Sequence, residues 1–546
     1  MVQKPKVYVI GVGMTKFEKP GRREDFDYPD MAKEAVTKAL SDAKIPYADV
    51  DAAVASWVYG DSASGQRALY EVGLSGCPIY NVNNNCSSGS TAIMLAKQIV
   101  ESGNASCALA FGFEKMERGS LTSKFMDRAN PMDKHVELMA DIAGINPSPI
   151  AAQMFGNAMI EHMQKYGTRP EHFAKIAYKN HLHSVNNPNS QFQEKYTLDQ
   201  IMKSPKIFGP LTKLQCCPTS DGSAAVLLAN EAFVRKHGLE NQAVEIVGME
   251  MSSDLPTTFS ERSCMNLVGY DMTRNAAEKL FTNTMYRPSD VDVIELHDCF
   301  SANELITYEA LGLCAPGKAA ELIDSGNNTY GGKYVVNPSG GLISKGHPLG
   351  ATGLAQCTEL CWQLRGEAGK RQVPGAKLAL QQNIGLGGAS VVALYRLGFP
   401  RKSTFYRKEV KAKEMEYSAN PDSFKANVLF KALEIAMQED EDNLIERMRG
   451  IYGFKVTDGP GGSVGYWVID AKTGKGSIEY NGKVKPDVVF TISDTDIMDF
   501  ISGKLNPQKA FFMGKVKIQG NMGLAMKLPD LQRRAAKKIA LIRAKL

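Results

Sequence analysis

The chain has 546 residues, of which 43% are hydrophobic and 23% charged, as expected of a globular protein with several domains. No apolar run approaches the roughly 18 residues of a membrane span, and the amino-terminal segment MVQKPKVYVIGVGM lacks the pattern of a secretory signal. The ten cysteines have no paired C-x-x-C spacing, which favours free thiols over disulfides or structural zinc.

Cysteine and histidine are confined to the first two-thirds of the chain. The cysteines lie between Cys77 and Cys361, and the histidines between His135 and His347. From residue 401 onward neither occurs, and 26 basic side chains stand against 18 acidic ones, which leaves a net charge of −3 for residues 1–400. Because thiols and imidazoles do most nucleophilic and acid-base work at neutral pH, we expect catalysis in the first part. We expect no nucleic-acid partner.

The first 400 residues contain an internal duplication. Three segments of the first half have similar segments, in the same order, in the second half: Val7–Phe17 with Val244–Ser253, Ala48–Ser56 with Ser289–Asp298, and Gly222–Phe233 with Gly388–Leu397. Strands that alternate with helices predict α/β layers. We therefore predict a duplicated, layered α/β fold with one half over residues 1–240 and the other over 241–398. Lys16 stands where a dinucleotide-binding fingerprint needs its third glycine, so we expect no bound NAD.

Cys86, in the sequence NNNCSSG, precedes a run with the spacing of an amphipathic helix, from Ala92 to Val100. The unpaired N–H groups and positive dipole of a helix N-terminus stabilise a thiolate, so we expect a lowered pKa for the Cys86 thiol. Cys86 is thus a candidate nucleophile. A buried structural cysteine is the alternative, and it is the commoner fate of a cysteine considered alone.

Residues from about 121 to 210 have no counterpart in the second half and contain polar, proline-containing stretches. We predict that they form an inserted loop domain that covers one face of the fold and grips the substrate. Within it, His181 and His183 lie one residue apart, a spacing that suits a metal only on a strand. A packed or solvated pair is the favoured interpretation.

Three segments of the second half carry further candidate residues. His297 and Cys299, in HDCF, follow the apolar run VDVIEL, and ligands bind at such strand ends in α/β sheets. His347, in GHPLGATG, is predicted to open a helix with Pro348 in its first turn. The turn NIGLGGAS, which contains Gly385, has backbone N–H groups able to face an oxyanion. Together with Cys86, these features predict a catalytic site.

Beyond a charged linker at 399–423, the chain is predicted to form a small α+β domain over 424–546. A helix follows the start signal Pro421-Asp422-Ser423, with Phe424, Val428, Leu429, Leu433 and Ala436 on one face. Five short strands are expected after it: IYGFKVTD, SVGYWVID, GSIEYNG, DVVFTIS and GKVKIQG.

The motifs at Cys86, His297, His347 and Gly385 together make residues 1–398 resemble thiolases, and in particular those of the sterol carrier protein X subclass. Thiolases outside this subclass carry a second catalytic cysteine in a C-x-G turn, where this chain has Asn383-Ile384-Gly385. The subclass places that thiol in HDCF. The resemblance therefore assigns the acid-base role to Cys299.

The resemblance implies a 3-oxoacyl-CoA thiolase. Cys86 would attack the 3-keto carbon after His347 takes its proton, and free CoA, the co-substrate, would accept the acyl group. His297 would donate to the thioester oxygen of the departing enolate while Cys299 protonates C2. Backbone N–H groups of Cys86 and Gly385 would form a second oxyanion hole. No metal or permanently bound cofactor is needed, and the sequence does not identify the residues that bind CoA.

Residues from about 424 to 530 resemble the sterol carrier protein lipid-transfer domain. The resemblance rests on GFKVTDGPGG from Gly453, on a hairpin that contains Trp467, and on Asn506–Leu528. It implies an apolar tunnel for lipids or sterols, and the surplus positive charge favours acidic headgroups or CoA phosphates. The alternative is that the apolar positions only fill a core.

The final residues Ala544, Lys545 and Leu546 are a near variant of the S-K-L peroxisomal signal, which predicts a peroxisomal protein and binding to an import receptor. The preceding segment LQRRAAKKIALIRAKL is predicted to be a basic amphipathic helix that contacts membranes or packs on its own domain.

The resemblance also implies 2-methyl-branched and sterol side-chain substrates and a homodimer. A condensing enzyme that runs the reverse Claisen reaction and a non-catalytic lipid carrier are the alternatives. The intact set of Cys86, His297, Cys299 and His347 argues against the carrier.

Overall fold

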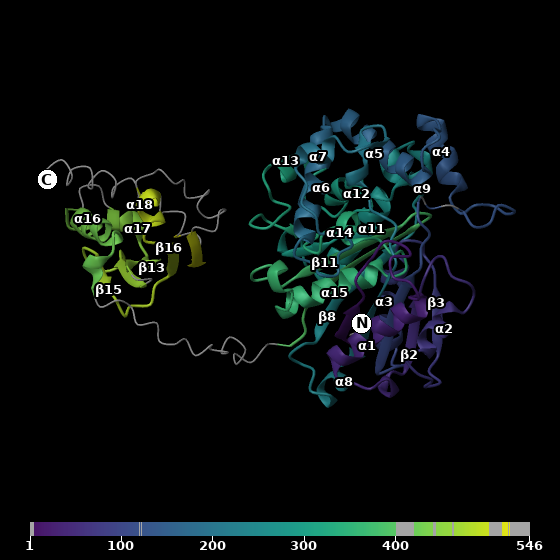
Figure 1. Cartoon of the computed structure of the whole chain (residues 1–546), viewed down its shortest axis with the longest axis horizontal. Helices are drawn as coiled ribbons and strands as arrows, with labels where there is room; N and C mark the ends of the chain where they lie inside the picture. The colour runs from purple at the N-terminus through teal and green to yellow at the C-terminus, as the bar shows by residue number, and fades with distance from the viewer. Residues whose placement is uncertain are drawn as a thin grey trace. The chain divides into compact units, whose positions relative to one another are not determined.

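The computed structural model describes residues 5–119, 121, 123–399, 420–439, 444–460, 463–501, 516–521 and 524. Its internal contacts divide the chain into two units, Met1–Arg401 and Lys402–Leu546, each described here by itself (Figure 1). Of the predicted linker only residues 399 and 420–423 are described, and the predicted basic helix and the signal at 544–546 lie outside the described residues. Within the described parts, no helix has the length and apolarity needed to cross a membrane.

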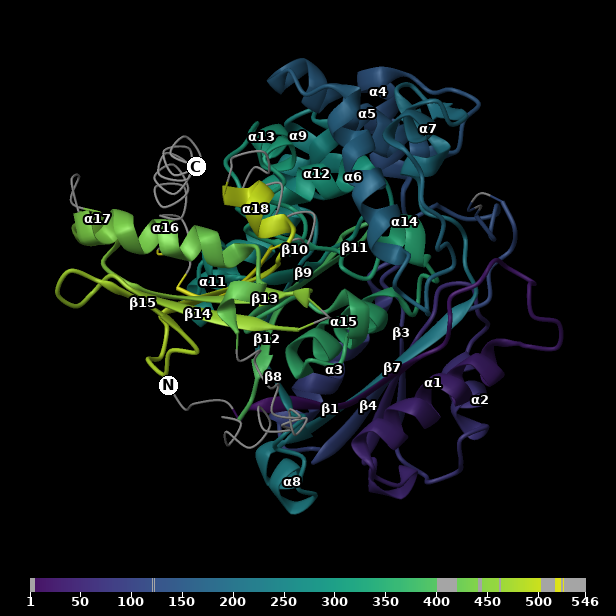
Figure 2. The same cartoon turned by 60° about the vertical axis from the view of Figure 1, so that its left-hand side comes forward.

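A ten-stranded sheet runs through the first unit in the order β10-β9-β11-β12-β8-β1-β7-β4-β2-β3 (Figure 2). The strands of the first half are β1 (Val7–Met14), β2 (Ala52–Ser56), β3 (Ile79–Val82), β4 (Cys107–Glu114) and β7 (Gly222–Asn230). Those of the second are β8 (Val244–Ser252), β9 (Val293–Glu295), β10 (Val335–Val336), β11 (Ala379–Gly385) and β12 (Ala389–Leu397). The two halves repeat one strand order and join where β1 pairs with β8. This arrangement confirms the predicted duplication and the α/β class.

One predicted strand is shorter than expected. The segment Gly222–Phe233 leaves the sheet at Asn230, whose side chain accepts a hydrogen bond of 2.9 Å from the N–H of Phe233. Asn230 thereby caps helix α8 (Glu231–Lys236), because a short polar side chain satisfies a helix N–H group that the chain itself leaves unpaired.

Helices occupy equivalent places in the two halves. Helix α1 (Tyr28–Ala43) packs on β1, β4 and β7, and α11 (Tyr270–Thr284) packs on β8 and β12. Helices α3 (Ser88–Glu101) and α15 (Thr352–Arg365) follow β3 and β10 and pack against each other (Figure 2). A β-carbon on Gly353 would lie 2.1 Å from Ser90 Oγ, so only glycine allows α3 and α15 to approach this closely. This contact brings the starts of α3 and α15 together.

The segment between β4 and β7 is helical rather than a set of loops. It contains α4 (Asp133–Ala143), α5 (Ile150–Tyr166), α6 (Pro170–Ser184) and α7 (Leu198–Met202), with the short strands β5 (Lys206–Phe208) and β6 (Leu211–Thr212). Helices α5 and α6 pack against α12 (Ser301–Ala310) of the second half. The remaining helices of this unit are short: α2 (Ser64–Tyr70), α9 (Pro256–Ser260), α10 (Cys264–Leu267), α13 (Ala319–Asp324) and α14 (Gly341–Lys345).

His181 and His183 lie on helix α6, and both rings are buried. Nε2 of His181 lies 3.1 Å from the carbonyl oxygen of Leu214, and Nδ1 of His183 lies 2.9 Å from that of Asn337. Nε2 of His183 also lies 2.8 Å from Thr329 Oγ1, whereas Nδ1 of His181 has no hydrogen-bond partner among the described residues. The burial of both rings on one helix agrees with the packed interpretation.

The second unit is a five-stranded sheet covered by helices, as predicted. The sheet has the order β15-β14-β13-β16-β17. Its strands are β13 (Ile451–Thr457), β14 (Gly465–Asp470), β15 (Ser477–Tyr480), β16 (Val488–Ser493) and β17 (Val516–Gly520). The helices are α16 (Ala426–Glu439), α17 (Leu444–Met448) and α18 (Asp496–Ile501).

Helix α16 packs on this sheet through an aromatic core. The Trp467 ring stacks on that of Phe430 with centroids 4.6 Å apart. The predicted inward position of Val428 is wrong, since 53% of its surface is exposed, and Phe430 takes its place beside Leu429 and Leu433. The inward stripe of α16 is thus rotated slightly from the predicted one.

Candidate active site

Cys86 lies in a turn between β3 and α3. Asn85 before it has a left-handed backbone with φ of 51°, and α3 begins two residues after it at Ser88. The N–H groups of Ser87 and Ser88 donate to the carbonyl oxygens of Asn84 and Asn85 over 3.2 and 3.0 Å. The structure thus confirms a helix start at Cys86, but these N–H groups are already bonded within the turn.

The predicted lowering of the Cys86 pKa is wrong. Burial of the sulfur raises the pKa of the Cys86 thiol to about 12, and the nearby carboxyl of Glu114 adds to the rise when it is charged. Burial also raises the pKa of Glu114 to about 7. Its carboxyl accepts hydrogen bonds from the N–H groups of Val58, Tyr59 and Gly350. Desolvation dominates here, so Cys86 rests as a thiol.

His347 lies between α14 and α15, with one ring nitrogen near the Cys86 sulfur. Its Nδ1 is 2.7 Å from Thr352 Oγ1, and that hydroxyl donates its proton to the carbonyl oxygen of Pro348 over 3.0 Å. The hydroxyl therefore accepts from Nδ1–H of His347, which leaves a lone pair on Nε2. Nε2 is buried and has no hydrogen-bond partner among the described residues. Helix α15 begins at Thr352, so the prediction that Pro348 lies in its first turn is wrong.

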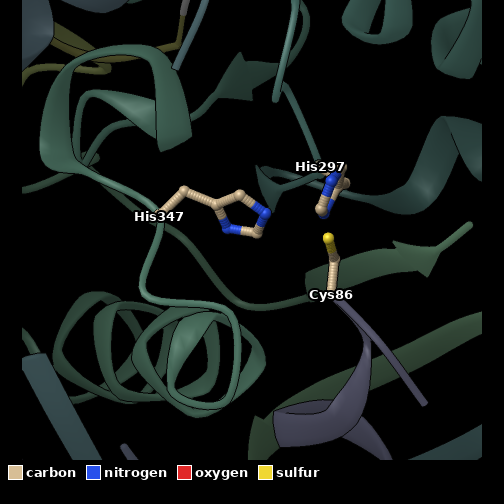
Figure 3. Close-up of side chains that lie close together, drawn as sticks. All are labelled: Cys86, His297 and His347. Carbon is tan, nitrogen blue, oxygen red and sulfur yellow. The ribbon is translucent and has the colours of Figure 1, made fainter. Parts of the chain in front are cut away.

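His297 follows β9 and faces the same point. Figure 3 shows Cys86, His297 and His347 converging, and the Cys86 sulfur and one nitrogen of each ring all lie within 4.8 Å of one another. The two imidazole planes meet at 85°, with ring centroids 5.0 Å apart. Burial, and then the proximity of His347, hold the pKa of His297 well below its usual range, so this ring is neutral. Burial likewise lowers the pKa of His347 to about 3.

Cys299 and Cys86 line one cavity of about 280 Å³, together with both histidines. Burial raises the pKa of the Cys299 thiol well above its usual range, so it holds its proton at neutral pH. In the free site Cys299 is therefore a potential proton donor rather than a base. The backbone of Cys299 is held in place by Cys217, whose N–H donates to the carbonyl oxygen of Cys299 over 2.8 Å.

Gly385 ends β11 beside the Cys86 turn. A β-carbon at this position would lie 2.0 Å from the carbonyl oxygen of Asn84, so close approach of the two backbones requires glycine. Asn85 Nδ2 also donates to the carbonyl oxygen of Leu386 over 3.1 Å. These contacts place the turn after β11 next to the turn that contains Cys86.

The rest of the cavity wall is mostly apolar. It includes Leu121, Ile150, Phe155, Ile207, Phe300 and Leu386. Phe155 from α5 stacks on Phe300 with ring centroids 4.8 Å apart, so the inserted helices and the HDCF motif form one wall. Cys216 and Cys217 also line the cavity, and neither is predicted from the sequence, since neither lies in a recognisable motif.

Family comparisons agree with this architecture. Residues 7–232 match the family "Thiolase, N-terminal domain", and residues 257–395 match "Thiolase C-terminal domain-like". Residues 430–533 match the "SCP-2 sterol transfer family". The fold and the site thus define a thiolase joined to a sterol-transfer domain.

The chain is 60% identical to Sterol carrier protein 2 of Oryctolagus cuniculus over 97% of its length and 96% of the relative. It is 58% identical to Sterol carrier protein 2 of Homo sapiens, over 96% of each chain. These relationships show that the chain belongs to the sterol carrier protein 2 family, in its form with an amino-terminal thiolase.

Solved structures share the thiolase fold. The Ltp2-ChsH2(DUF35) aldolase superposes with a TM-score of 0.61 at 23% identity, over 72% of this chain and 97% of that chain. Human mitochondrial 3-ketoacyl-CoA thiolase in complex with CoA gives a TM-score of 0.55 at 20% identity, over 72% and 98%. At these identities the likeness supports the fold alone.

Proposed function

We propose that Cys86 is the nucleophile of 3-oxoacyl-CoA thiolysis and that His347 is its base. One observation carries this proposal: a ring nitrogen of His347 lies within 4.8 Å of the Cys86 sulfur, and Nε2 of the same ring is buried without a hydrogen-bond partner among the described residues. Because the thiol is protonated at rest, Nε2 takes its proton as the sulfur attacks the 3-keto carbon. The C2–C3 bond then breaks, and the acyl group passes from Cys86 to free CoA.

The departing fragment is a CoA enolate, which must gain a proton at C2. Cys299 is the proton donor, because it lines the same cavity and its raised pKa keeps it as a thiol until the carbanion forms. His297 stabilises the enolate by donating to the thioester oxygen. Backbone N–H groups of Cys86 and Gly385 form the oxyanion hole for the attacked carbonyl.

The substrates are 2-methyl-branched and sterol side-chain 3-oxoacyl-CoA esters. The apolar cavity wall and the Phe155–Phe300 stack support a bulky hydrocarbon beside the thiol. The second unit carries lipid or sterol ligands. Ala544, Lys545 and Leu546 direct the protein to peroxisomes through the import receptor, and the basic segment before them provides peripheral membrane contact.

The thiolase unit is a homodimer whose interface includes β3. This strand lies at the end of the ten-stranded sheet, where β2 is its one partner among the described strands. Apolar side chains gather near this edge: Tyr70, Leu74 and Tyr80 are 52%, 81% and 46% exposed. An unpaired edge with exposed apolar side chains favours pairing with a second copy. Cys86 follows β3 closely, so such pairing would also brace the nucleophile turn.

The test is a thiolysis assay on the full chain. Wild type should remove the magnesium-enolate absorbance of a 3-oxoacyl-CoA when CoA is added, and Cys86→Ala should abolish this. Cys107→Ala is the matched control, because Cys107 is buried in β4 away from the cavity lining. Both variants should bind a fluorescent fatty acid like wild type. A wild type that binds lipid without thiolysis would support the non-catalytic carrier, and condensation much faster than thiolysis would support the reverse Claisen enzyme.

A further inference from the structure

Asn383 occupies the position where thiolases outside this subclass carry their second catalytic cysteine, and it touches a catalytic candidate. Its side-chain Nδ2 lies 2.9 Å from Nδ1 of His297, and both residues are buried. On β11, side chains alternate between the two faces, so Asn383 and Gln381 point to the same side of the strand. That side faces α3 and α15.

The direction of the Asn383 amide is fixed by a chain of buried hydrogen bonds. Gln381 Nε2 donates to the carbonyl oxygen of Gly353 over 2.7 Å and also to Ser90 Oγ over 2.9 Å. Because a carbonyl oxygen can only accept a hydrogen bond, the NH₂ end of the Gln381 amide must face Gly353. At its other end, Gln381 Oε1 accepts from the Tyr395 hydroxyl. The Ser90 hydroxyl accepts from Gln381, so it donates its single proton to Asn383 Oδ1, 2.8 Å away. The NH₂ end of Asn383 must then face His297.

We propose that Asn383 holds neutral His297 in the tautomer that carries its proton on Nε2, and so makes His297 a hydrogen-bond donor to the reacting thioester. Nδ1 accepts from Asn383 and cannot also carry a proton, so the proton of the neutral ring sits on the other nitrogen. The inference rests on the oxyanion-stabilising role proposed for His297. Asn383 acts through His297 and is a positioning residue.

The two histidines are thereby held in opposite tautomers. Thr352 leaves a lone pair on Nε2 of His347, which suits a base, whereas Asn383 leaves a proton on Nε2 of His297, which suits a donor. The same arrangement leaves His297 without a lone pair for a metal ion, although a thiol and two imidazoles meet here. The titratable groups that line the cavity with His297 are His347, Cys86, Cys299, Cys216 and Cys217, and Asp298 follows His297 in the chain.

The variant Asn383→Asp should reverse the tautomer. A carboxylate accepts a proton from Nδ1–H, so neutral His297 would lose its Nε2 proton and only the imidazolium would donate. The carboxylate should raise the pKa of His297 in this variant. Above that pKa we expect kcat to fall about tenfold per pH unit, a descending limb that the wild-type pH profile lacks. Asn383→Ala should lower kcat by about tenfold or less with a wild-type pH profile, because a free neutral imidazole still populates the Nε2–H form.

Two controls separate this inference from the proposed function. The rate at which iodoacetamide alkylates Cys86 should stay within about twofold of the wild-type rate in both variants, because His347 and not His297 is the base for Cys86. The double variant Asn383→Asp/His297→Ala should lack the new limb. A wild-type pH profile in Asn383→Asp, or the same new limb in Asn383→Ala, would overturn the inference. If His297→Ala alone keeps full kcat, the role proposed for His297 fails instead.

A measurement on wild type tests the tautomer directly, and a variant is needed only to assign the resonances. In protein labelled with ¹⁵N-histidine, the resonances lost in His297→Ala identify this ring. We expect a protonated Nε2 and an unprotonated Nδ1 for it at pH 7. The opposite pattern would refute the tautomer assignment whatever the behaviour of the Asn383 variants.

Discussion

Replacing Thr352 by valine keeps the shape of the side chain and removes the acceptor that orients His347. In the wild type, Nδ1–H of His347 donates to Thr352 Oγ1 over 2.7 Å, and Thr352 is buried. In the variant this N–H would be buried without a partner. Without that acceptor the proton is no longer held on Nδ1, and a ring that carries it on Nε2 cannot accept the proton of Cys86.

The size of the effect follows from the lost hydrogen bond. An unsatisfied buried donor costs about 1–3 kcal/mol, and about 1.4 kcal/mol corresponds to a factor of ten in rate. We therefore expect both kcat for thiolysis and the rate of Cys86 alkylation by iodoacetamide to fall about 5- to 150-fold in Thr352→Val. The two rates should fall together, because each requires deprotonation of Cys86.

Thr352→Ser is the matched control, since it keeps the hydroxyl that accepts from His347 and donates to Pro348. It should retain most of the activity. The melting temperature of each variant should be recorded, because Thr352 starts α15 and its loss can loosen the helix. A stably folded Thr352→Val protein with wild-type alkylation and kcat would show that His347 does not act as the base in the tautomer described.

Three further changes probe other parts of the molecule. Burial raises the pKa of Glu114 from 4.5 to about 7, so its contribution to stability is full below pH 4.5 and declines as the pH rises to 7. The decline in the free energy of unfolding should be about 3 kcal/mol, and urea denaturation at several pH values should show that it is absent in Glu114→Gln. Gly385→Ala places a β-carbon 2.0 Å from the Asn84 carbonyl oxygen and should cost about 1–3 kcal/mol in thermal unfolding while lowering kcat. Trp467→Ala removes the ring stacked on Phe430, so it should cost the second unit about 3–5 kcal/mol and its lipid binding while thiolysis stays unchanged.

Much of the fold was predictable from the sequence because the duplication repeats a strand order as well as a pattern. The paired segments at Val7–Phe17 and Val244–Ser253 became β1 and β8, the two strands at which the halves join. The helical content of 121–210 was missed, since its helices bury small and polar side chains such as Gln153 and Asn157 that weaken the periodic signal. Tertiary packing against α12 stabilises them instead.

The motifs also identified candidate residues that the fold brings to one cavity, but the pKa values and hydrogen-bond partners of these residues could not be predicted from the sequence. The pKa of Cys86 depends on Glu114, which lies 28 positions away in sequence and reaches the site only because β4 runs beside β2. Likewise, nothing in NIGLGG shows that Asn383 faces a ring nitrogen of His297. Such effects depend on which groups the fold buries together, and no local pattern records that.

The duplication also explains how a nearly symmetric frame carries an asymmetric site. Helices α3 and α15 are equivalent, and they meet where Gly353 packs on Ser90. Ser90 lies in the first turn of the helix that follows Cys86, and its hydroxyl directs the Asn383 amide and thus His297. The first half therefore contributes the proposed nucleophile, Cys86, and also orients the proposed donor, His297, from the second half. Because one helix start serves both, a change in α3–α15 packing should impair attack and enolate stabilisation together, which a site of independent residues would not show.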